Sequence, residues 1–135
     1  MALPLIIPDL DIWLRVFDRA APDARCVNAF REKTLSRQLV LLAWLRQGLL
    51  ARCADDRQAQ RLRSALAGFG NLPSTVADQD AAAARVRHLR SQGQGCGAWQ
   101  ARVWALAERT QALIWSQDRL WQPLIAHGCP VRAMV

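Results

Sequence analysis

Several features of a secreted, membrane-bound or zinc-binding protein are missing from this 135-residue chain. No apolar run approaches the roughly 18 residues that a membrane-spanning helix requires, and the N-terminus lacks the basic segment of an export signal. No cysteines are spaced as CxxC, and the two histidines do not complete a zinc pattern. We therefore expect a cytoplasmic protein without membrane contact. We also expect reduced cysteines that fill the core at Cys26, Cys53, Cys96 and Cys129.

Lysine is almost absent, and basic residues outnumber acidic ones. The 18 basic residues are 17 Arg and Lys33, against 11 acidic residues, so the net charge is +7 and the isoelectric point is about 10.9. An arginine-rich surface fits the binding of a polyanion such as RNA. It fits equally well a coding bias toward arginine in a GC-rich genome. Charge alone therefore establishes no nucleic-acid function.

The chain does contain a regular alternation of short apolar runs and amphipathic segments. Its length and its apolar fraction of 52% suit one compact domain over residues 1–135. Strands are predicted at 3–8, 71–76, 112–115 and 130–135, and helices at 11–20, 25–33, 36–53, 57–66, 78–92, 98–110 and 119–126. Strands that alternate with helices predict an α/β fold with a mostly parallel sheet covered on both faces.

Two of the predicted strands are followed by an aspartate. Asp9 comes directly after the apolar run at 3–8, and Asp118 comes three residues after the strand at 112–115. Open parallel sheets bind ligands at the carboxyl ends of their strands. We therefore expect the two carboxylates to face each other across a pocket. The alternative is that both simply cap the helices that follow, a position that aspartate favours.

Four segments in a fixed order carry a family resemblance. They are Asp9 to Trp13 (Asp-x-x-x-Trp), a leucine-rich helix with Gly48, the arginine-rich stretch Asp56 to Arg63, and Leu113 to Arg119. Together they resemble the PIN domain, and specifically the VapC-type toxins of bacterial toxin–antitoxin pairs, over about residues 3–128. The resemblance implies a PIN-like three-layer fold, with a parallel sheet of four or five strands flanked by helices. It also implies a homodimer and an antitoxin partner.

In that family, four acidic side chains hold one or two Mg²⁺ or Mn²⁺ ions, which activate water against an RNA phosphodiester. The first of these acids matches Asp9 and the fourth matches Asp118, whereas the second falls on Trp44 and the third on Ala98. Two of the four ligands are thus replaced by apolar residues. Asp11 is an additional carboxylate beside the first position. The resemblance therefore implies catalytic roles for Asp9 and Asp118, and Mg or Mn held weakly or not at all by Asp9, Asp11 and Asp118.

Two functions are compatible with this set of acidic residues, and a third candidate function involves binding without catalysis. The first is a VapC-like protein whose metal-dependent ribonuclease activity is lost or weakened, and which retains binding of an antitoxin, a second copy of itself or RNA. The second is an active Mg-dependent endoribonuclease toxin of a type II toxin–antitoxin system that uses Asp9, Asp11 and Asp118. The third is a basic RNA-binding module, whose affinity would fall steeply with salt.

The aromatic residues near the missing acids also have two interpretations. Trp44 could stack a nucleobase, which contributes ~1–3 kcal/mol. It could instead pack against Ala98 and Trp99, and the large apolar surface of tryptophan favours packing. Arg102 stands where the family has an apolar residue and could form an ion pair with Asp9 or Asp118. The other tryptophans are expected in the core, at Trp13, Trp104, Trp115 and Trp121.

Overall fold

The structure is a computed structural model that describes residues 2–17 and 23–135. In chain order its elements are β1 (Ile6–Pro8), α1 (Leu10–Phe17), α2 (Ala24–Leu35), β2 (Val40–Leu42), α3 (Ala43–Ala51), α4 (Asp56–Leu66), β3 (Gly70–Leu72), α5 (Val76–Ser91), α6 (Ala98–Thr110), β4 (Leu113–Trp115), the 3-10 turn η1 (Arg119–Trp121), α7 (Gln122–Ile125) and β5 (Val131–Arg132). Strands alternate with helices along the chain, as predicted.

The five strands found among the described residues are all parallel, and they form two ladders. β1, β4 and β5 make a three-stranded sheet in that order, and β2 pairs with β3. A single parallel bridge between Ile6 and Leu39 joins β1 to the residue before β2. The order across the molecule is therefore β3-β2-β1-β4-β5. The predicted α/β fold with a parallel sheet of four or five strands is confirmed. The two ladders are joined at this bridge, where the Ile6 amide also donates to the Gln38 carbonyl at 2.8 Å.

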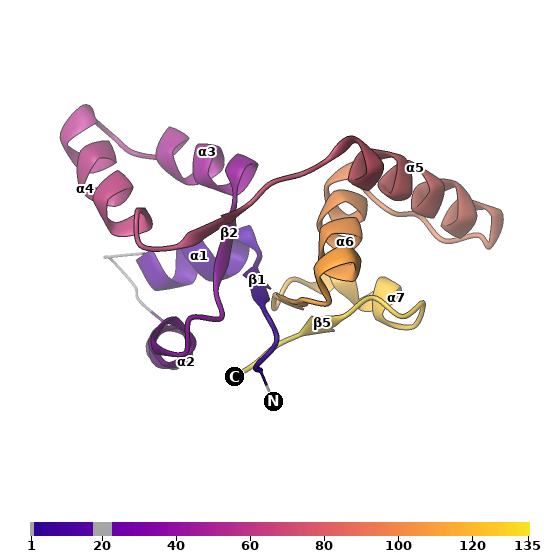
Figure 1. Ribbon diagram of the computed structural model, residues 1–135, viewed down its shortest axis with the longest axis horizontal. Coiled ribbons are helices and arrows are strands. Elements are labelled where there is room, and N and C mark those ends of the chain that lie inside the picture. The colour runs from indigo at the N-terminus through magenta and orange to yellow at the C-terminus, as the bar shows by residue number, and fades with distance from the viewer. Residues whose placement is uncertain (1, 18–22) are drawn as a thin grey trace.

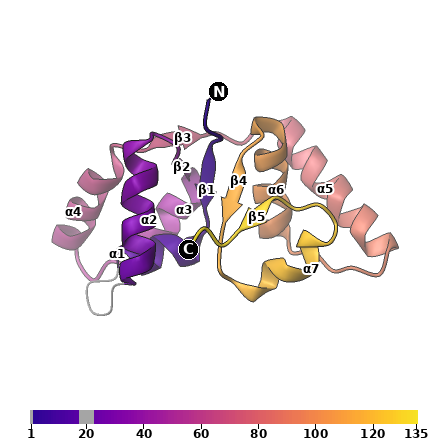
Figure 2. The same ribbon diagram turned by 90° about the horizontal axis from the view of Figure 1, so that it is seen from below.

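Helices flank the strands on both sides. Figures 1 and 2 show α1 to α4 gathered on the side of β2 and β3, and α5 to α7 on the side of β4 and β5. The first group encloses a cluster of aromatic rings. Trp13 meets Phe30 and Phe69 edge to face, with ring centroids 5.1 and 5.2 Å apart. Such contacts add to the burial of apolar area and fix the mutual position of α1 and α2.

The segment 36–53 was predicted as one helix, and this prediction is wrong in its first third. Residues 40–42 form β2, and only residues 43–51 form α3. Leu41 and Leu42 are fully buried, and a continuous buried apolar run has no period that separates strand from helix. Ser36 does not begin a helix either. It lies at the C-terminal end of α2, where its amide donates to the carbonyl of Glu32 at 3.1 Å.

Other predicted boundaries hold to different degrees. The helix predicted at 98–110 has the bounds of α6, and the last strand lies at the edge of the sheet as β5. The strand predicted at 71–76 is only β3, because Thr75 already caps α5. The helix predicted at 11–20 ends at Phe17 as α1, and the predicted residues 18–20 lie outside the described part of the chain.

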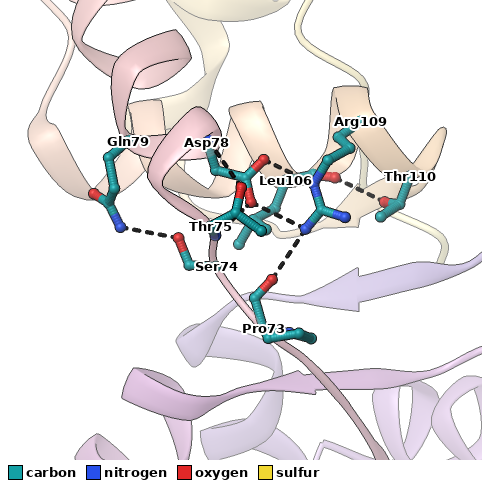
Figure 3. Close-up of polar contacts among 8 residues, drawn as sticks. All are labelled: Pro73, Ser74, Thr75, Asp78, Gln79, Leu106, Arg109 and Thr110. Carbon is teal, nitrogen blue, oxygen red and sulfur yellow. Dashed lines mark hydrogen bonds and ion pairs between the residues drawn. The ribbon is translucent and has the colours of Figure 1, made fainter.

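An ion pair between the buried Asp78 and the exposed Arg109 anchors the start of α5 against the end of α6 (Figure 3). Asp78 is 4% exposed and accepts hydrogen bonds from Nε and Nη2 of Arg109 at 2.8 and 3.0 Å. Arg109 also donates to the Pro73 carbonyl at 3.0 Å, and Thr75 and Asp78 exchange hydrogen bonds in a capping box. The Arg109 guanidinium lowers the pKa of Asp78 below its ordinary value of 3.8. We name these four residues the α5–α6 clasp.

Within residues 2–17 and 23–135, no helix has the length and apolar character needed to cross a bilayer.

Candidate functional site

Asp9 sits where β1 passes into α1, at the carboxyl edge of the sheet. Its backbone amide donates to the Trp115 carbonyl at 2.8 Å, which holds the tip of β1 beside β4. Its own carbonyl accepts from the amides of Ile12 and Trp13, at 3.0 and 3.3 Å, and so begins the helix. The Trp13 indole donates to the Pro8 carbonyl at 2.9 Å, so a buried hydrogen bond also holds the end of β1 against α1. The position of Asp9 is therefore fixed by the backbone on both sides.

The carboxylate of Asp9 is buried and already hydrogen-bonded. The residue is 6% exposed. The indole nitrogen of Trp99, in the first turn of α6, donates to Oδ1 at 3.2 Å. The indole nitrogen of Trp121, in η1, donates to Oδ2 at 2.9 Å. Each carboxylate oxygen thus has a tryptophan N–H as its partner, in an arrangement that we call the two-indole clamp.

Asp11 and Asp118 are linked through Ser116. The Ser116 hydroxyl donates to Oδ1 of Asp11 at 2.9 Å, and the Gln117 amide donates to Oδ2 of Asp11 at the same distance. The Asp118 amide donates to Ser116 Oγ at 3.0 Å. Burial raises the pKa of Asp11 above its ordinary value, and the charge of Asp9 adds to this increase. Asp118 is exposed and caps η1 by accepting from the Leu120 amide at 3.0 Å, so its predicted capping role is confirmed.

The three carboxylates line one open cavity of about 360 Å³. Its walls also contain leucine, glutamine and tryptophan side chains, and the full lining is Asp9, Leu10, Asp11, Leu14, Trp99, Gln100, Asp118, Leu120 and Trp121. The structure therefore brings together the two strand-end aspartates that lie 109 residues apart in sequence (118 minus 9). No arginine or lysine of the described residues lines this cavity, although the chain has 18 of them.

Trp44, which the sequence resemblance aligns with the second acid, packs on Trp99. The two rings meet edge to face with centroids 5.6 Å apart. Ala98, which the resemblance aligns with the third acid, is exposed at the start of α6, so the expected packing is confirmed for the two tryptophans. The Arg102 guanidinium lies 5.1 Å from the Trp44 ring centroid and 6.0 Å from that of Trp99. Arg102 forms no ion pair with Asp9 or Asp118, so that alternative is wrong.

The donor set does not fit the divalent cation that the PIN-like fold implies. Mg²⁺ and Mn²⁺ need several hard oxygen ligands converging on one point. In the described ranges 2–17 and 23–135, no group of three or more His, Cys, Asp or Glu side chains is close enough to hold a metal ion. Both oxygens of Asp9 face indole N–H groups, which are donors only. The described residues therefore do not form a site for a divalent cation.

The cysteines do not supply a nucleophile to this site. Cys26 and Cys129 are buried, Cys53 and Cys96 are half-buried, and all four are free thiols. Core filling is thus confirmed for two of the four. Burial raises the pKa of Cys129 to about 12 and also raises the pKa of Cys26 and Cys96, which disfavours the reactive thiolate.

Comparison with known proteins supports the fold. No family model matches the chain, and no curated protein does. Among solved structures, FitAcB from Neisseria gonorrhoeae matches with a TM-score of 0.70 at 17% identity, covering 96% of this chain and 98% of that one. A toxin–antitoxin complex from Klebsiella pneumoniae matches with a TM-score of 0.75 at 14% identity and the same coverages. VapBC2 from Rickettsia felis, bound to a DNA fragment from its promoter, matches with a TM-score of 0.71 at 11% identity over 89% of this chain and 92% of that one. The chain thus has the fold of these solved structures, which is the PIN-like α/β fold predicted from the sequence.

The sequence located the pocket but not the partners of its carboxylates. The indole donors Trp99 and Trp121 and the hydroxyl of Ser116 were not predicted as site residues. Trp121 was assigned to the core, where it is indeed 2% exposed, yet its N–H also reaches Asp9. The available signal is that a buried tryptophan usually finds an acceptor for its N–H and that Asp9 is a buried acceptor, although the buried N–H groups of Trp44 and Trp115 have no partner among the described residues. Which donor pairs with which acceptor follows only from the fold.

Proposed function

We propose that this chain is a PIN-like, toxin-type protein that binds an antitoxin-like protein partner and has lost or greatly weakened metal-dependent ribonuclease activity. The partner is supported by the solved structures of the same fold, which include a toxin–antitoxin complex and a VapBC2 assembly. The loss of activity is supported by the site itself. Trp44 and Ala98 replace two acids, and the two-indole clamp engages a third.

The clamp is the observation on which this proposal mainly depends. Hydrolysis of a phosphodiester by a metal-bound water requires carboxylates that are free to coordinate the cation. Asp9 lies at the first ligand position, is 6% exposed, and has a tryptophan donor on each oxygen. Asp11 likewise has one donor on each oxygen. Asp118 alone among the three is exposed and has no donor from the described residues on its second oxygen, and one carboxylate binds Mg²⁺ weakly.

The proposal includes binding to RNA and to a second copy of the chain. RNA binding is supported by the charge of +7 and by exposed arginines on α4 at Arg57, Arg61 and Arg63. Phosphate contacts from such side chains give affinity without sequence preference. Pairing with a second copy rests on the family resemblance of the sequence.

An active endoribonuclease is the second candidate, and one observation favours it. Asp9, Asp11 and Asp118 line the same open cavity, and Asp118 is exposed to solvent. A rotation of the indole side chains would free the Asp9 oxygens toward this cavity. In that case Asp118 would be required for cleavage.

RNA cleavage separates the two candidates. The purified chain is incubated with labelled single-stranded RNA and millimolar Mn²⁺, alongside Asp118→Asn and the matched control Asp80→Asn. Asp80 is exposed on α5, so its replacement changes the charge equally without touching the cavity. We expect no cleavage above background with any of the three proteins. Cleavage by the wild type and by Asp80→Asn that disappears in Asp118→Asn would establish the nuclease.

Partner binding is tested by coexpression with the product of the neighbouring open reading frame. We expect the two chains to copurify and to elute together on size exclusion. Elution of this chain alone, at the same volume with and without the second product, would contradict the proposed pairing.

A further inference from the structure

We infer that Asp9 is a hydrogen-bond acceptor that joins two helical segments in place of a metal ligand, and that its indole donors exclude a divalent cation even when the missing acids are restored. The inference rests on the proposed loss of metal chemistry but goes beyond it. The absent acids alone would explain a weak site. The clamp predicts that restoring them is not sufficient.

The geometry assigns the carboxylate a joining role. Trp99 belongs to α6 and Trp121 to η1, and they lie 90 and 112 residues from Asp9 in sequence. Asp9 itself is tied to β4 through its amide. One buried side chain therefore connects the tip of β1 to two segments on the far half of the molecule. A buried carboxylate is unfavourable unless donors compensate its charge, and hydrogen bonds to an ionised acceptor are stronger than neutral ones.

The same donors make the position repulsive to a cation. An indole N–H places the positive end of its dipole at the oxygen that it contacts, and the ring nitrogen cannot accept a bond in return. A cation at Asp9 would have to displace one or both of these groups. The Arg102 guanidinium, 6.0 Å from the Trp99 ring centroid, adds a fixed positive charge on the side of Trp44. Donors of the chain itself therefore stand where a metal ion would have to approach Asp9.

The indole resonances report the clamp directly. In proton–nitrogen correlation spectra, we expect the Trp99 and Trp121 indole N–H signals to show hydrogen bonding and slow hydrogen exchange. Asparagine offers one acceptor oxygen, so in Asp9→Asn at least one of the two signals should shift and exchange at least tenfold faster. The exposed control Asp80→Asn should leave both signals unchanged. Unchanged signals in Asp9→Asn would overturn the inference.

Restored-acid variants test the exclusion of metal with Mn²⁺ as the only probe. Trp44→Glu with Ala98→Asp supplies both missing acids and leaves both indole donors, Trp99 and Trp121, in the chain; their N–H signals show whether the clamp persists without the Trp44 ring. Adding Trp99→Phe retains an aromatic ring but removes one donor. We expect the triple variant to bind Mn²⁺ at least tenfold more tightly than the double variant, measured by the shift in melting temperature. Trp121→Phe in the same background is the second route if Trp99→Phe does not fold.

Equal Mn²⁺ affinity in the double and triple variants would overturn the inference that the indole donors prevent a divalent cation from binding. In that outcome the lost acids alone would explain the weak site, so the proposed function would survive. Tight Mn²⁺ binding by the wild type that is abolished by Asp9→Asn would instead overturn both.

Discussion

Each carboxylate of the cavity is defined by the donors around it. Asp9 faces two indoles, Asp11 faces a hydroxyl and a backbone amide, and Asp118 caps a turn at the surface. Residues of one type, close in space, therefore have different environments. The sequence predicted that Asp9 and Asp118 would converge, because both follow buried strands. It could not predict the donors, since the bonds to Asp9 span 90 and 112 residues and depend on the packing of α6 and η1.

Asp11 should make stability fall as pH rises through the acidic range. Burial raises its pKa in the folded state above 3.8, so the folded protein holds this proton more tightly than the unfolded chain. The stability that this proton provides is complete below 3.8 and is lost as pH rises through the folded-state pKa. The test is urea unfolding of the wild type and of Asp11→Asn between pH 3 and about pH 6. As pH increases, the unfolding free energy of the wild type should decrease relative to that of Asp11→Asn. A difference that stays constant with pH would contradict the environment described for Asp11.

Among the elements, strand β2 and the α5–α6 clasp show what local patterns can and cannot predict. The helix 98–110 was predicted with its observed bounds, because a glycine-rich loop precedes it and a buried strand follows. β2 was missed because a three-residue strand with every residue buried shows no alternation. The acid Asp78 was predicted to begin a helix, but its pairing with Arg109, 31 residues away, follows only from the packing of α5 on α6.

Breaking the clasp should destabilise the protein without affecting the cavity. Asp78→Asn removes the charge that accepts two bonds from Arg109, and hydrogen bonds to charged groups contribute about 1.5–3 kcal/mol. We expect a loss of this size in the free energy of unfolding by urea at neutral pH. Because the pKa of Asp78 is lowered in the folded state, the stability that it provides is present above 3.8 and is lost as pH falls below that value.

Asp80→Asn is the matched control for the clasp, since Asp80 is exposed on the same helix two residues further along. Its unfolding free energy should lie within about 0.5 kcal/mol of the wild type. Equal losses in Asp78→Asn and Asp80→Asn would contradict a specific role for the ion pair.

For the molecule as a whole, the sequence predicted the fold class, because strand and helix patterns alternate along the entire chain. The division of the sheet into two ladders was not predictable. It depends on a single bridge between Ile6 and Leu39 at the centre of the strand order. The net charge of +7 also follows from the sequence alone, but the positions of the charges on the surface follow only from the fold.

If the exposed arginines of α4 bind RNA, the affinity for RNA must depend steeply on the salt concentration. For single strands, the logarithm of the binding constant falls by about 0.7 for each neutralised phosphate per unit of log salt. Arg61→Gln on α4 should reduce this slope by about 0.7 in fluorescence-anisotropy titrations. Arg31→Gln, an equal charge change on an exposed position of α2, should leave the slope unchanged. Affinity that does not vary with salt would exclude phosphate contacts.

The central claim is that the cavity beside Asp9 does not bind a divalent cation in the native chain. The most direct measurement is the melting temperature of the wild type during a Mn²⁺ titration into the millimolar range, against NaCl of equal ionic strength. A bound ligand stabilises the folded state by about 2.7 kcal/mol at a hundred times its dissociation constant. The account predicts the same melting temperature in Mn²⁺ and in NaCl. A rise specific to Mn²⁺ that disappears in Asp118→Asn would contradict it.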